Sequence, residues 1–152
     1  MKSSTLFQER LAGIAAWLYA VWQSRDLSHA WMDSPYDKAG FLAFLIWCLP
    51  VLLKIWRESP MRMGWFAAGV LISLAGSIGE LNFVKYAGLA VVTCGFLPPG
   101  RVSWVQLAGA VCWMPLLGWV ISSGGVTAVN SLRVITALVT VFVVLRPPAF
   151  LR

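Results

Sequence analysis

Six long apolar runs, joined by short polar connections, make up most of the 152-residue chain. They cover about 6–23, 40–56, 63–79, 82–97, 104–122 and 126–145. A helix rises about 1.5 Å per residue, so roughly 20 residues cross the apolar core of a bilayer, which is about 30 Å thick. The runs approach that length and lack the alternation found in membrane-barrel strands. The sequence therefore predicts one domain, an all-α polytopic transmembrane bundle of six spans.

The composition favours the same interpretation. Apolar residues make up 59% of the chain and charged residues 12%, whereas about a quarter of an average soluble domain is charged. The net charge of +6 comes from basic residues scattered between the runs, without the basic patch of a nucleic-acid-binding protein. We therefore expect the lipid bilayer, and not nucleic acid, to surround or contact this chain.

The basic residues of the connections predict the orientation, because cytoplasmic loops are enriched in Lys and Arg. If successive runs alternate in direction, eight basic residues lie on one side and three on the other. The larger group is Lys2, Arg10, Lys54, Arg57, Arg62, Arg101, Arg146 and Arg152, and the smaller is Arg25, Lys38 and Lys85. Both termini are therefore expected in the cytoplasm, which requires an even number of spans.

The first run leaves one alternative open. Phe7, Leu11, Ile14, Leu18 and Trp22 fall on a single stripe of a helix. A helix of this kind can also lie along the membrane interface. That arrangement would leave five spans and place the two termini on opposite sides.

Tryptophans are placed as the membrane interpretation predicts. Several lie near span ends, where indole rings favour the headgroup layer: Trp22, Trp31, Trp56, Trp65, Trp104 and Trp119. Trp47 and Trp113 lie deeper in their runs. We expect these two to pack between helices rather than to hold a cofactor.

Prolines and small residues bear on how the helices pack. Pro50 and Pro115 fall inside the second and fifth runs, and a kink is expected at each because proline lacks an amide donor. The third run carries a face of small residues that would let another helix approach closely: Gly69, Ser73, Gly76 and Ser77. That other helix would belong to the same bundle or to a partner protein.

Arg133 is the most informative residue of the last run. It lies seven residues into the run, about 10 Å below the outer surface. A charge near the middle of a span costs about 2.5–3.5 kcal/mol on insertion scales, so Arg133 should face the bundle and have a partner. Thr127, Asn130, Ala137 and Thr140 share its helical face. The guanidinium is either functional or structural, and a structural one would snorkel outward or pin two helices together.

The longest connection, at 25–40, is predicted on the outer side and contains the only histidine. His29, Asp33, Tyr36 and Asp37 could form a small polar site there, with His29 as a base near neutral pH. The alternative is a flexible, solvated connection.

Glu80 lies near Lys85 in the outer turn between the third and fourth runs. A local ion pair between the two is one interpretation. The other pairs Glu80 with Arg133, which would bring a carboxylate and a guanidinium into one outer vestibule.

Metal and cofactor sites are not expected. One histidine cannot build a site of three nitrogen ligands. Cys48, Cys94 and Cys112 lie in separate runs and form no CxxC pair, so neither a disulfide framework nor a zinc site is predicted.

Several stretches of the chain resemble the exosortase/archaeosortase family of polytopic membrane proteins. The stretch HAWMDSPYDKAGFLAFLIW is similar in placement to the early outer loop of that family, with Trp31, Tyr36 and Gly40 at the matching positions. The stretches 76–97 and 113–119 resemble its middle helices and its Pro-containing helix. The resemblance implies a bacterial or archaeal cytoplasmic membrane and, for the family, processing of C-terminal sorting tails.

The catalytic set of the family is a Cys in Cys-Ser-Gly, an Arg in Asn-x-x-Arg, and a later His. Asn130-Ser131-Leu132-Arg133 matches the second motif. Cys94-Gly95 lacks the serine, and no histidine follows Arg133. His29 is expected outside, about one membrane thickness from Cys94, whereas a nucleophile and its base must be within hydrogen-bonding reach. Cys112 lies nearer the depth of Arg133, in a context that matches no family motif.

Three hypotheses follow. The first is a small, non-catalytic relative that serves as an accessory or assembly subunit, with other membrane subunits or a second copy as partners. The second is a membrane thiol peptidase or transpeptidase that uses Cys112 or Cys94 with Arg133. The third is a small transporter or channel with Arg133 in its path. The incomplete catalytic set favours the first.

Overall fold

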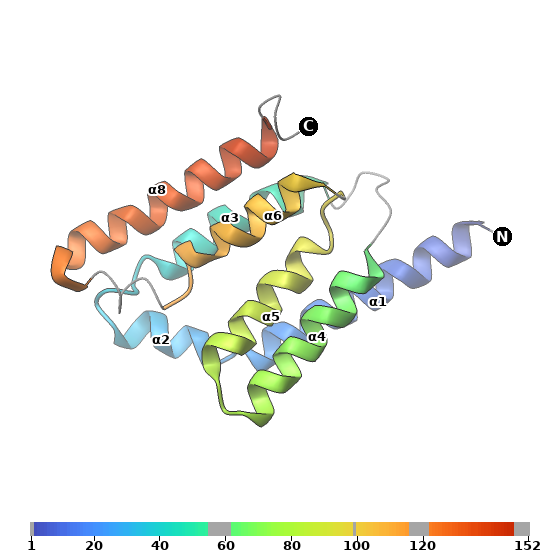
Figure 1. Ribbon diagram of the computed structural model, residues 1–152, viewed down its shortest axis with the longest axis horizontal. Coiled ribbons are helices and arrows are strands. Elements are labelled where there is room, and N and C mark those ends of the chain that lie inside the picture. Colours follow the sequence, from blue (N-terminus) through green and yellow to red (C-terminus); the bar gives the residue numbers. More distant parts are fainter. Residues whose placement is uncertain (1, 55–61, 99, 116–121, 148–152) are drawn as a thin grey trace.

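All regular structure in the described part of the chain is helical, which confirms the all-α prediction. The computed structural model describes residues 2–54, 62–98, 100–115 and 122–147, and these ranges contain no strand. The helices are α1 (Lys2–Gln23), α2 (Leu27–Asp33), α3 (Gly40–Lys54), α4 (Met63–Ile78), α5 (Asn82–Cys94), α6 (Arg101–Gly109) and α8 (Val126–Leu145). Short 3-10 turns follow α6 at Ala110–Cys112 and precede α8 at Ser122–Gly124. Figure 1 shows this order from blue to red.

Five of the six apolar runs coincide with single helices. α1, α3, α4, α5 and α8 each begin and end within a few residues of the run that predicts them. The match follows from the chain itself, because long, mainly apolar runs without interior proline, or with a single one as in α3, favour helix until a polar turn ends them.

The fifth run is the exception: the predicted helix over 104–122 is interrupted in its described part, and 116–121 lie outside the described residues. α6 ends at Gly109, the 3-10 turn ends at Cys112, and Pro115 lies in a turn. The proline ring excludes the carbonyl of residue 111 from a regular helix, so an unbroken helix up to Pro115 is disfavoured. Pro50, in contrast, lies within α3, as expected.

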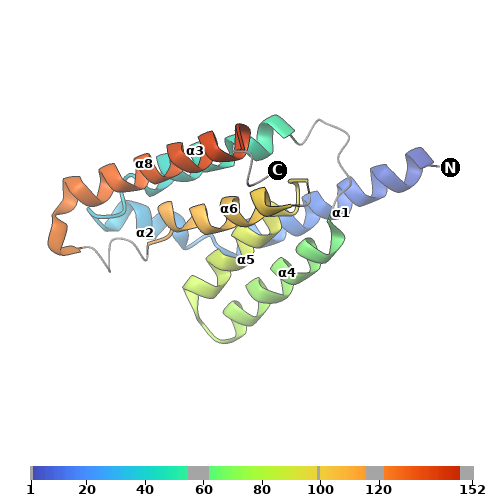
Figure 2. The same ribbon diagram turned by 45° about the horizontal axis from the view of Figure 1, so that its top comes forward.

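The helices form two groups of three (Figures 1 and 2). α1, α4 and α5 pack together, and the α4–α5 contact is the most extensive of the fold. α3, α6 and α8 form the second group. Aromatic rings of the second group add to the core: Trp47 and Trp113 are fully buried with ring centroids 5.6 Å apart. The prediction that these two residues pack between helices is confirmed.

The small-residue face of α4 packs within the molecule. Gly69, Ser73 and Gly76 are buried against α5. A Cβ on Gly69 would lie 2.8 Å from the Gly88 carbonyl oxygen, so only glycine allows this approach. Ser77 donates a hydrogen bond of 2.6 Å to Gln23 of α1. The question whether this face meets the bundle or a partner is thus answered in favour of the bundle.

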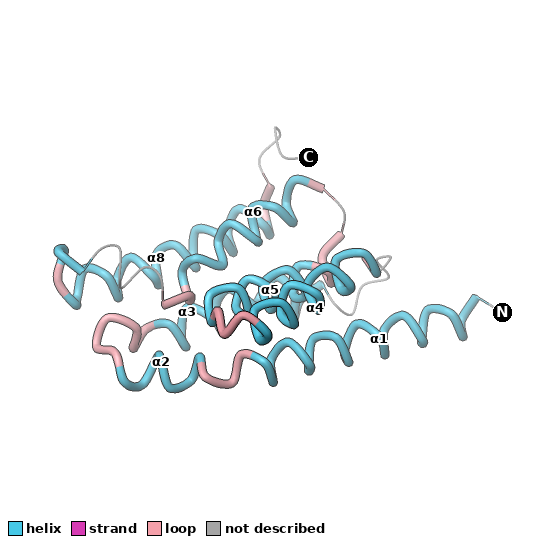
Figure 3. Tube along the Cα trace, turned by 60° about the horizontal axis from the view of Figure 1, so that its bottom comes forward, coloured by secondary structure: helices cyan, strands magenta, loops and turns pink. Residues whose placement is uncertain are grey.

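The start of α1 projects at one end of the molecule, α2 lies toward the other end, and α8 runs so that its end points the same way as the start of α1 (Figures 1 and 3). α2 lies within the 25–40 connection, for which the sequence predicts no helix.

One helix in the described ranges, α8, is long and apolar enough to cross a membrane by length and composition. The helical segments Gly40–Leu53 and Met63–Ile78 are apolar but shorter. Large apolar side chains on the outward face of α8 are exposed: Ile135, Leu138, Val139 and Phe142. Among the residues used for orientation and interface placement, Trp56, Arg57, Trp119 and Arg152 lie outside the described residues.

Candidate functional site

One face of α8 forms the inner wall of the site. Arg133, Ala137 and Thr140 are buried, and Asn130 is half-buried. Thr127, one turn nearer the start of the helix, is exposed, so the inward face that the sequence predicts begins at Asn130. Arg133 is 0% exposed, which makes it one of the largest fully enclosed side chains described.

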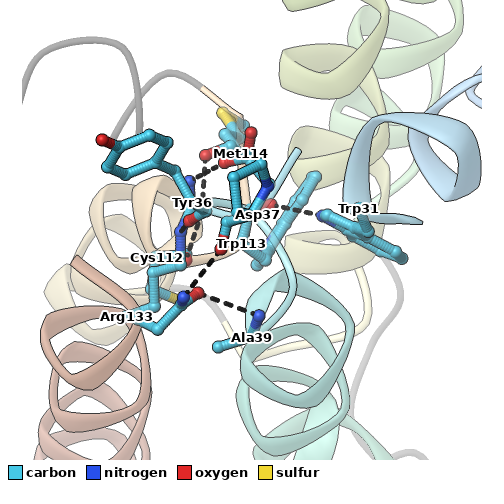
Figure 4. Close-up of polar contacts among 10 residues, drawn as sticks. Trp31, Tyr36, Asp37, Ala39, Cys112, Trp113, Met114 and Arg133 are labelled. Atoms are coloured by element: carbon cyan, nitrogen blue, oxygen red, sulfur yellow. Dashed lines mark hydrogen bonds and ion pairs between the residues drawn. The ribbon is translucent and has the colours of Figure 1, made fainter. Parts of the chain in front are cut away.

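Arg133 has four acceptors, all supplied by the protein (Figure 4). Its Nε donates to the Tyr36 carbonyl at 3.1 Å. One terminal nitrogen, Nη1, donates to the carbonyls of Cys112 and Met114 at 2.9 and 2.8 Å. The other, Nη2, forms a buried ion pair with Asp37. The guanidinium thus joins α8 to the turn before α3 and to the chain that follows α6.

The carbonyls that Arg133 binds lie where the fifth run leaves the helical conformation, at the end of the 3-10 turn and in the turn that follows it. Three successive carbonyls, those of residues 112, 113 and 114, accept hydrogen bonds from side chains there. Arg133 takes the first and third of them, and Trp31 Nε1 donates to the middle one, on Trp113, at 2.9 Å. Buried backbone groups need such partners, since an unpaired one costs about 1–3 kcal/mol.

Asn130 extends the same contact by one helical turn. The backbone amide of Ala39 donates to Asn130 Oδ1 at 3.0 Å, and Asn130 Nδ2 donates to the Pro35 carbonyl at 2.9 Å. Both fixed residues of the Asn-x-x-Arg motif, Asn130 and Arg133, therefore form hydrogen bonds with the segment 35–39. We call Asn130, Arg133, Asp37 and Trp31, with the carbonyls that they bind, the Arg133 clamp.

Both interpretations of Glu80 are corrected by this geometry. The carboxylate partner of Arg133 is Asp37, and Glu80 is exposed in the turn after α4. Lys85 does not pair locally with Glu80 either, because its Nζ lies 3.6 Å from Asp26 and 2.8 Å from Asn82 Oδ1. Closeness in the sequence did not predict these pairs, because Arg133 and Asp37 are 96 residues apart and Lys85 and Asp26 are 59 residues apart.

The outer polar cluster is only partly assembled. Asp37 is buried with Arg133, and Tyr36 contributes its carbonyl to the same guanidinium. His29 and Asp33 lie on α2 and are exposed. The structure therefore does not bring His29 into a buried site with Arg133.

The cysteines are all reduced and buried. The main-chain carbonyl of Cys112 accepts a hydrogen bond from Arg133. Cys94 is the last residue of α5. Cys94 and Cys112 are both 0% exposed and Cys48 is 9% exposed. In the described ranges, no group of three or more His, Cys, Asp or Glu side chains is placed to hold a metal ion.

The main contribution that sequence reasoning missed is Trp31. Its indole fits against Gly40, where any Cβ would collide with the ring nitrogen. Trp31 and Gly40 are part of the family resemblance, and Pro115 predicts a kink, but no local pattern joins the two segments.

Comparison with protein-family models, curated proteins and solved structures found no match for the chain.

Proposed function

We propose that the chain is a six-span protein of the bacterial or archaeal cytoplasmic membrane, with both termini inside. The start of α1 and the end of α8 point the same way along the bundle, which supports an even number of crossings. Exposed apolar side chains on α3 and α8 support lipid contact, because a water-soluble surface seldom carries contiguous patches of this kind. α1 packs along α4 and α5, which favours a span over an interfacial helix.

Within that membrane, the function that the geometry supports best is a non-catalytic, exosortase-like accessory or assembly subunit. The observation that carries this proposal is the saturation of Arg133. An arginine that stabilises a reacting carbonyl must offer it a free, well-aimed donor. The guanidinium here is enclosed and donates to four acceptors of its own chain. Arg133 therefore stabilises the packing of three segments and has no donor left for a substrate.

The buried thiols point the same way. A cysteine nucleophile must reach its substrate, and a paired base must lie within hydrogen-bonding distance. Cys94 and Cys112 are fully enclosed, and His29 is on the exposed side of α2. The outward apolar faces of α3 and α8 remain for lipid and for partner subunits.

The proposal is tested by deletion and complementation in the native host. We expect a membrane complex to lose one of its subunits when the chain is deleted, and that subunit to co-purify with the tagged full chain in mild detergent. A variant with Cys48, Cys94 and Cys112 all changed to Ser should restore the complex fully. A chain that purifies alone from native membranes, and whose deletion leaves every membrane complex intact, would contradict the proposal.

A second candidate function is a thiol peptidase that acts on C-terminal sorting tails. One observation favours it: Arg133 Nη1 lies 2.9 Å from the Cys112 carbonyl, so two residue types of the family's catalytic set are neighbours. Cys112→Ser would then abolish tail processing without lowering the melting temperature. Cys94→Ser would leave tail processing intact. Full processing by each of the three variants Cys48→Ser, Cys94→Ser and Cys112→Ser would exclude thiol catalysis.

A further inference from the structure

Two tryptophans bring the starts of α4 and α6 into contact. Trp65 lies in the first turn of α4, and Trp104 lies at the end of the first turn of α6. Their rings make an edge contact, with centroids 5.1 Å apart. Trp65 is half-buried, whereas Trp104 is 62% exposed. The pair therefore presents an indole surface to the surroundings at a place where two helices begin.

Arg62, the residue before α4, lies over this pair. Its guanidinium carbon is 4.3 Å from the centre of the Trp65 ring, and its backbone amide donates to the Gly95 carbonyl at 3.4 Å. No carboxylate in the part of the chain that the structure describes forms an ion pair with Arg62. A guanidinium over an aromatic ring uses its face, which leaves N–H groups at its edge for another acceptor.

The guanidinium of Arg62 is partly accessible. Nη1 is enclosed and has no acceptor, so it is not the atom that a ligand reaches. The side chain as a whole is half-exposed, which leaves Nη2 and Nε for contact with a ligand.

Arg101 supplies a second positive charge beside the two tryptophans. It is the first residue of α6 and is exposed. It precedes Trp104 by three residues, so the two side chains share one face of the helix. We call Arg62, Trp65, Arg101 and Trp104 the Arg–Trp surface. Both arginines belong to the larger basic group, which the sequence predicts in the cytoplasm.

The chemistry of the Arg–Trp surface matches the headgroup layer of the cytoplasmic leaflet. Indole rings favour that layer, and the anionic lipids of the leaflet attract basic residues close to the membrane. Arginine can bind a phosphate through two parallel N–H groups. A free phosphate would use the arginines alone, whereas a phospholipid also uses the exposed indole of Trp104. This step rests on the membrane placement and orientation proposed above.

We propose that the Arg–Trp surface binds an anionic phospholipid of the cytoplasmic leaflet. The lipid phosphate accepts hydrogen bonds from Arg62 and Arg101, and the glycerol region lies against Trp104. Trp65 is a positioning residue, because it contacts the face of the Arg62 guanidinium. Two arginines disfavour a headgroup that carries its own cation, such as choline, so the surface selects lipids with a net negative charge.

The experiment is native mass spectrometry of the delipidated full chain in detergent, titrated with phosphatidylglycerol and phosphatidylcholine that have identical acyl chains. Each lipid has one phosphate, and only phosphatidylglycerol has a net negative charge. We expect phosphatidylglycerol to bind about tenfold more tightly, because two arginines favour the anionic headgroup. Excess inorganic phosphate should not displace the lipid. Displacement by phosphate would assign the surface to a free anion and overturn the lipid proposal.

Variants without the charge test the two arginines. Arg62→Gln and Arg101→Gln should each lower the preference for phosphatidylglycerol about threefold, and the double variant should abolish it. Lys38→Gln is the control, because it removes an exposed charge from the predicted outer side. This control should keep the full preference.

Two further variants keep the charge and test the geometry. Trp65→Leu removes the ring beneath Arg62, and Arg62→Lys replaces the planar fork of donors by a single ammonium. Each should lower the preference about twofold although the net charge is unchanged. A full preference in both variants would mean attraction by charge alone and would overturn the site. Arg62→Lys decides the matter if Trp65→Leu unfolds.

Equal affinity of the parent chain for the two lipids, or a full preference in the double variant, would also overturn the proposal. Neither result would contradict the membrane placement as long as detergent is needed to extract the chain from the membrane fraction. A chain recovered without detergent would contradict the membrane placement itself.

Discussion

At the scale of single residues, the enclosed charge of Arg133 is made tolerable by the groups around it. Removing a guanidinium from water is costly, and the cost is offset only when its donors are matched. Asp37 supplies the opposite charge, and the carbonyls of Tyr36, Cys112 and Met114 take the remaining bonds. Arg133 therefore donates hydrogen bonds to main-chain carbonyls that would otherwise be buried without a partner.

Arg133→Met should destabilise the fold by about 3–5 kcal/mol, because it leaves the Asp37 carboxylate buried without a partner. Methionine fills much of the volume, so the loss reports on charge and hydrogen bonds more than on packing. Unfolding in detergent, followed by far-UV circular dichroism, measures the change.

A double-mutant cycle separates the ion pair from the carbonyl contacts. Asp37→Asn combined with Arg133→Met should be markedly less destabilising than the sum of the two single changes, since no charge is then left unpaired. Additive effects, or a loss below about 0.5 kcal/mol for Arg133→Met, would contradict the clamp.

Trp31→Phe tests the indole that completes the clamp. Phenylalanine keeps an aromatic ring but removes the donor to the Trp113 carbonyl, so we expect a loss of about 1 kcal/mol. Trp104→Phe is the control, because Trp104 is exposed and keeps its edge contact with Trp65. Equal melting temperatures for the two variants would show that the Trp31 bond contributes nothing.

At the scale of helices, the tightest contact is that between α4 and α5. Gly88 makes it possible, because a Cβ there would lie 2.6 Å from the Ser73 amide nitrogen and 2.7 Å from the Gly69 carbonyl oxygen. These atoms belong to the backbone of α4 and cannot move aside without separating the helices.

Gly88→Ala should therefore destabilise the fold by about 1–3 kcal/mol, the usual cost of overpacking. Gly64→Ala is the matched control: Gly64 lies in α4, and a Cβ there meets nothing within 4 Å. The control should be neutral or stabilise by up to about 1 kcal/mol through helix propensity. Thermal unfolding of both variants in the same detergent measures the difference. A Gly88→Ala variant as stable as Gly64→Ala would contradict the close contact between α4 and α5.

Helices were predictable from the sequence because apolar length is a local signal, and α1, α3, α4, α5 and α8 all follow it. The fifth run failed because a proline in an apolar run is compatible with either a kink or a break. The outcome depends on whether side chains elsewhere, here Arg133 and Trp31, can take the open carbonyls.

The candidate site was predictable only in part. The burial of Arg133 follows from helical periodicity, but the choice of Asp37 over Glu80 does not. Both carboxylates were expected at the outer end, and only the packing of segment 35–39 onto α8 brings one of them to the guanidinium. Pairings across 96 residues carry no local pattern.

At the scale of the whole molecule, α2 and the start of α8 lie toward one end, and the start of α1 and the end of α8 point away from it. The eight-to-three count of the sequence predicts that the side with the start of α1 and the end of α8 is cytoplasmic. If that side is cytoplasmic, His29 should be outside while Lys2 and Arg146 are inside.

Single cysteines at these three positions test that arrangement, in a background where Cys48, Cys94 and Cys112 are changed to Ser. A membrane-impermeant maleimide should label His29→Cys in intact cells, because His29 is exposed on α2. Lys2→Cys and Arg146→Cys should be labelled only after permeabilisation. Labelling of Lys2→Cys but not Arg146→Cys in intact cells would mean that α1 lies along the interface and that five helices cross. That result would contradict the six-span arrangement. It would not affect the Arg133 clamp, because α1 contributes none of the hydrogen bonds of the clamp.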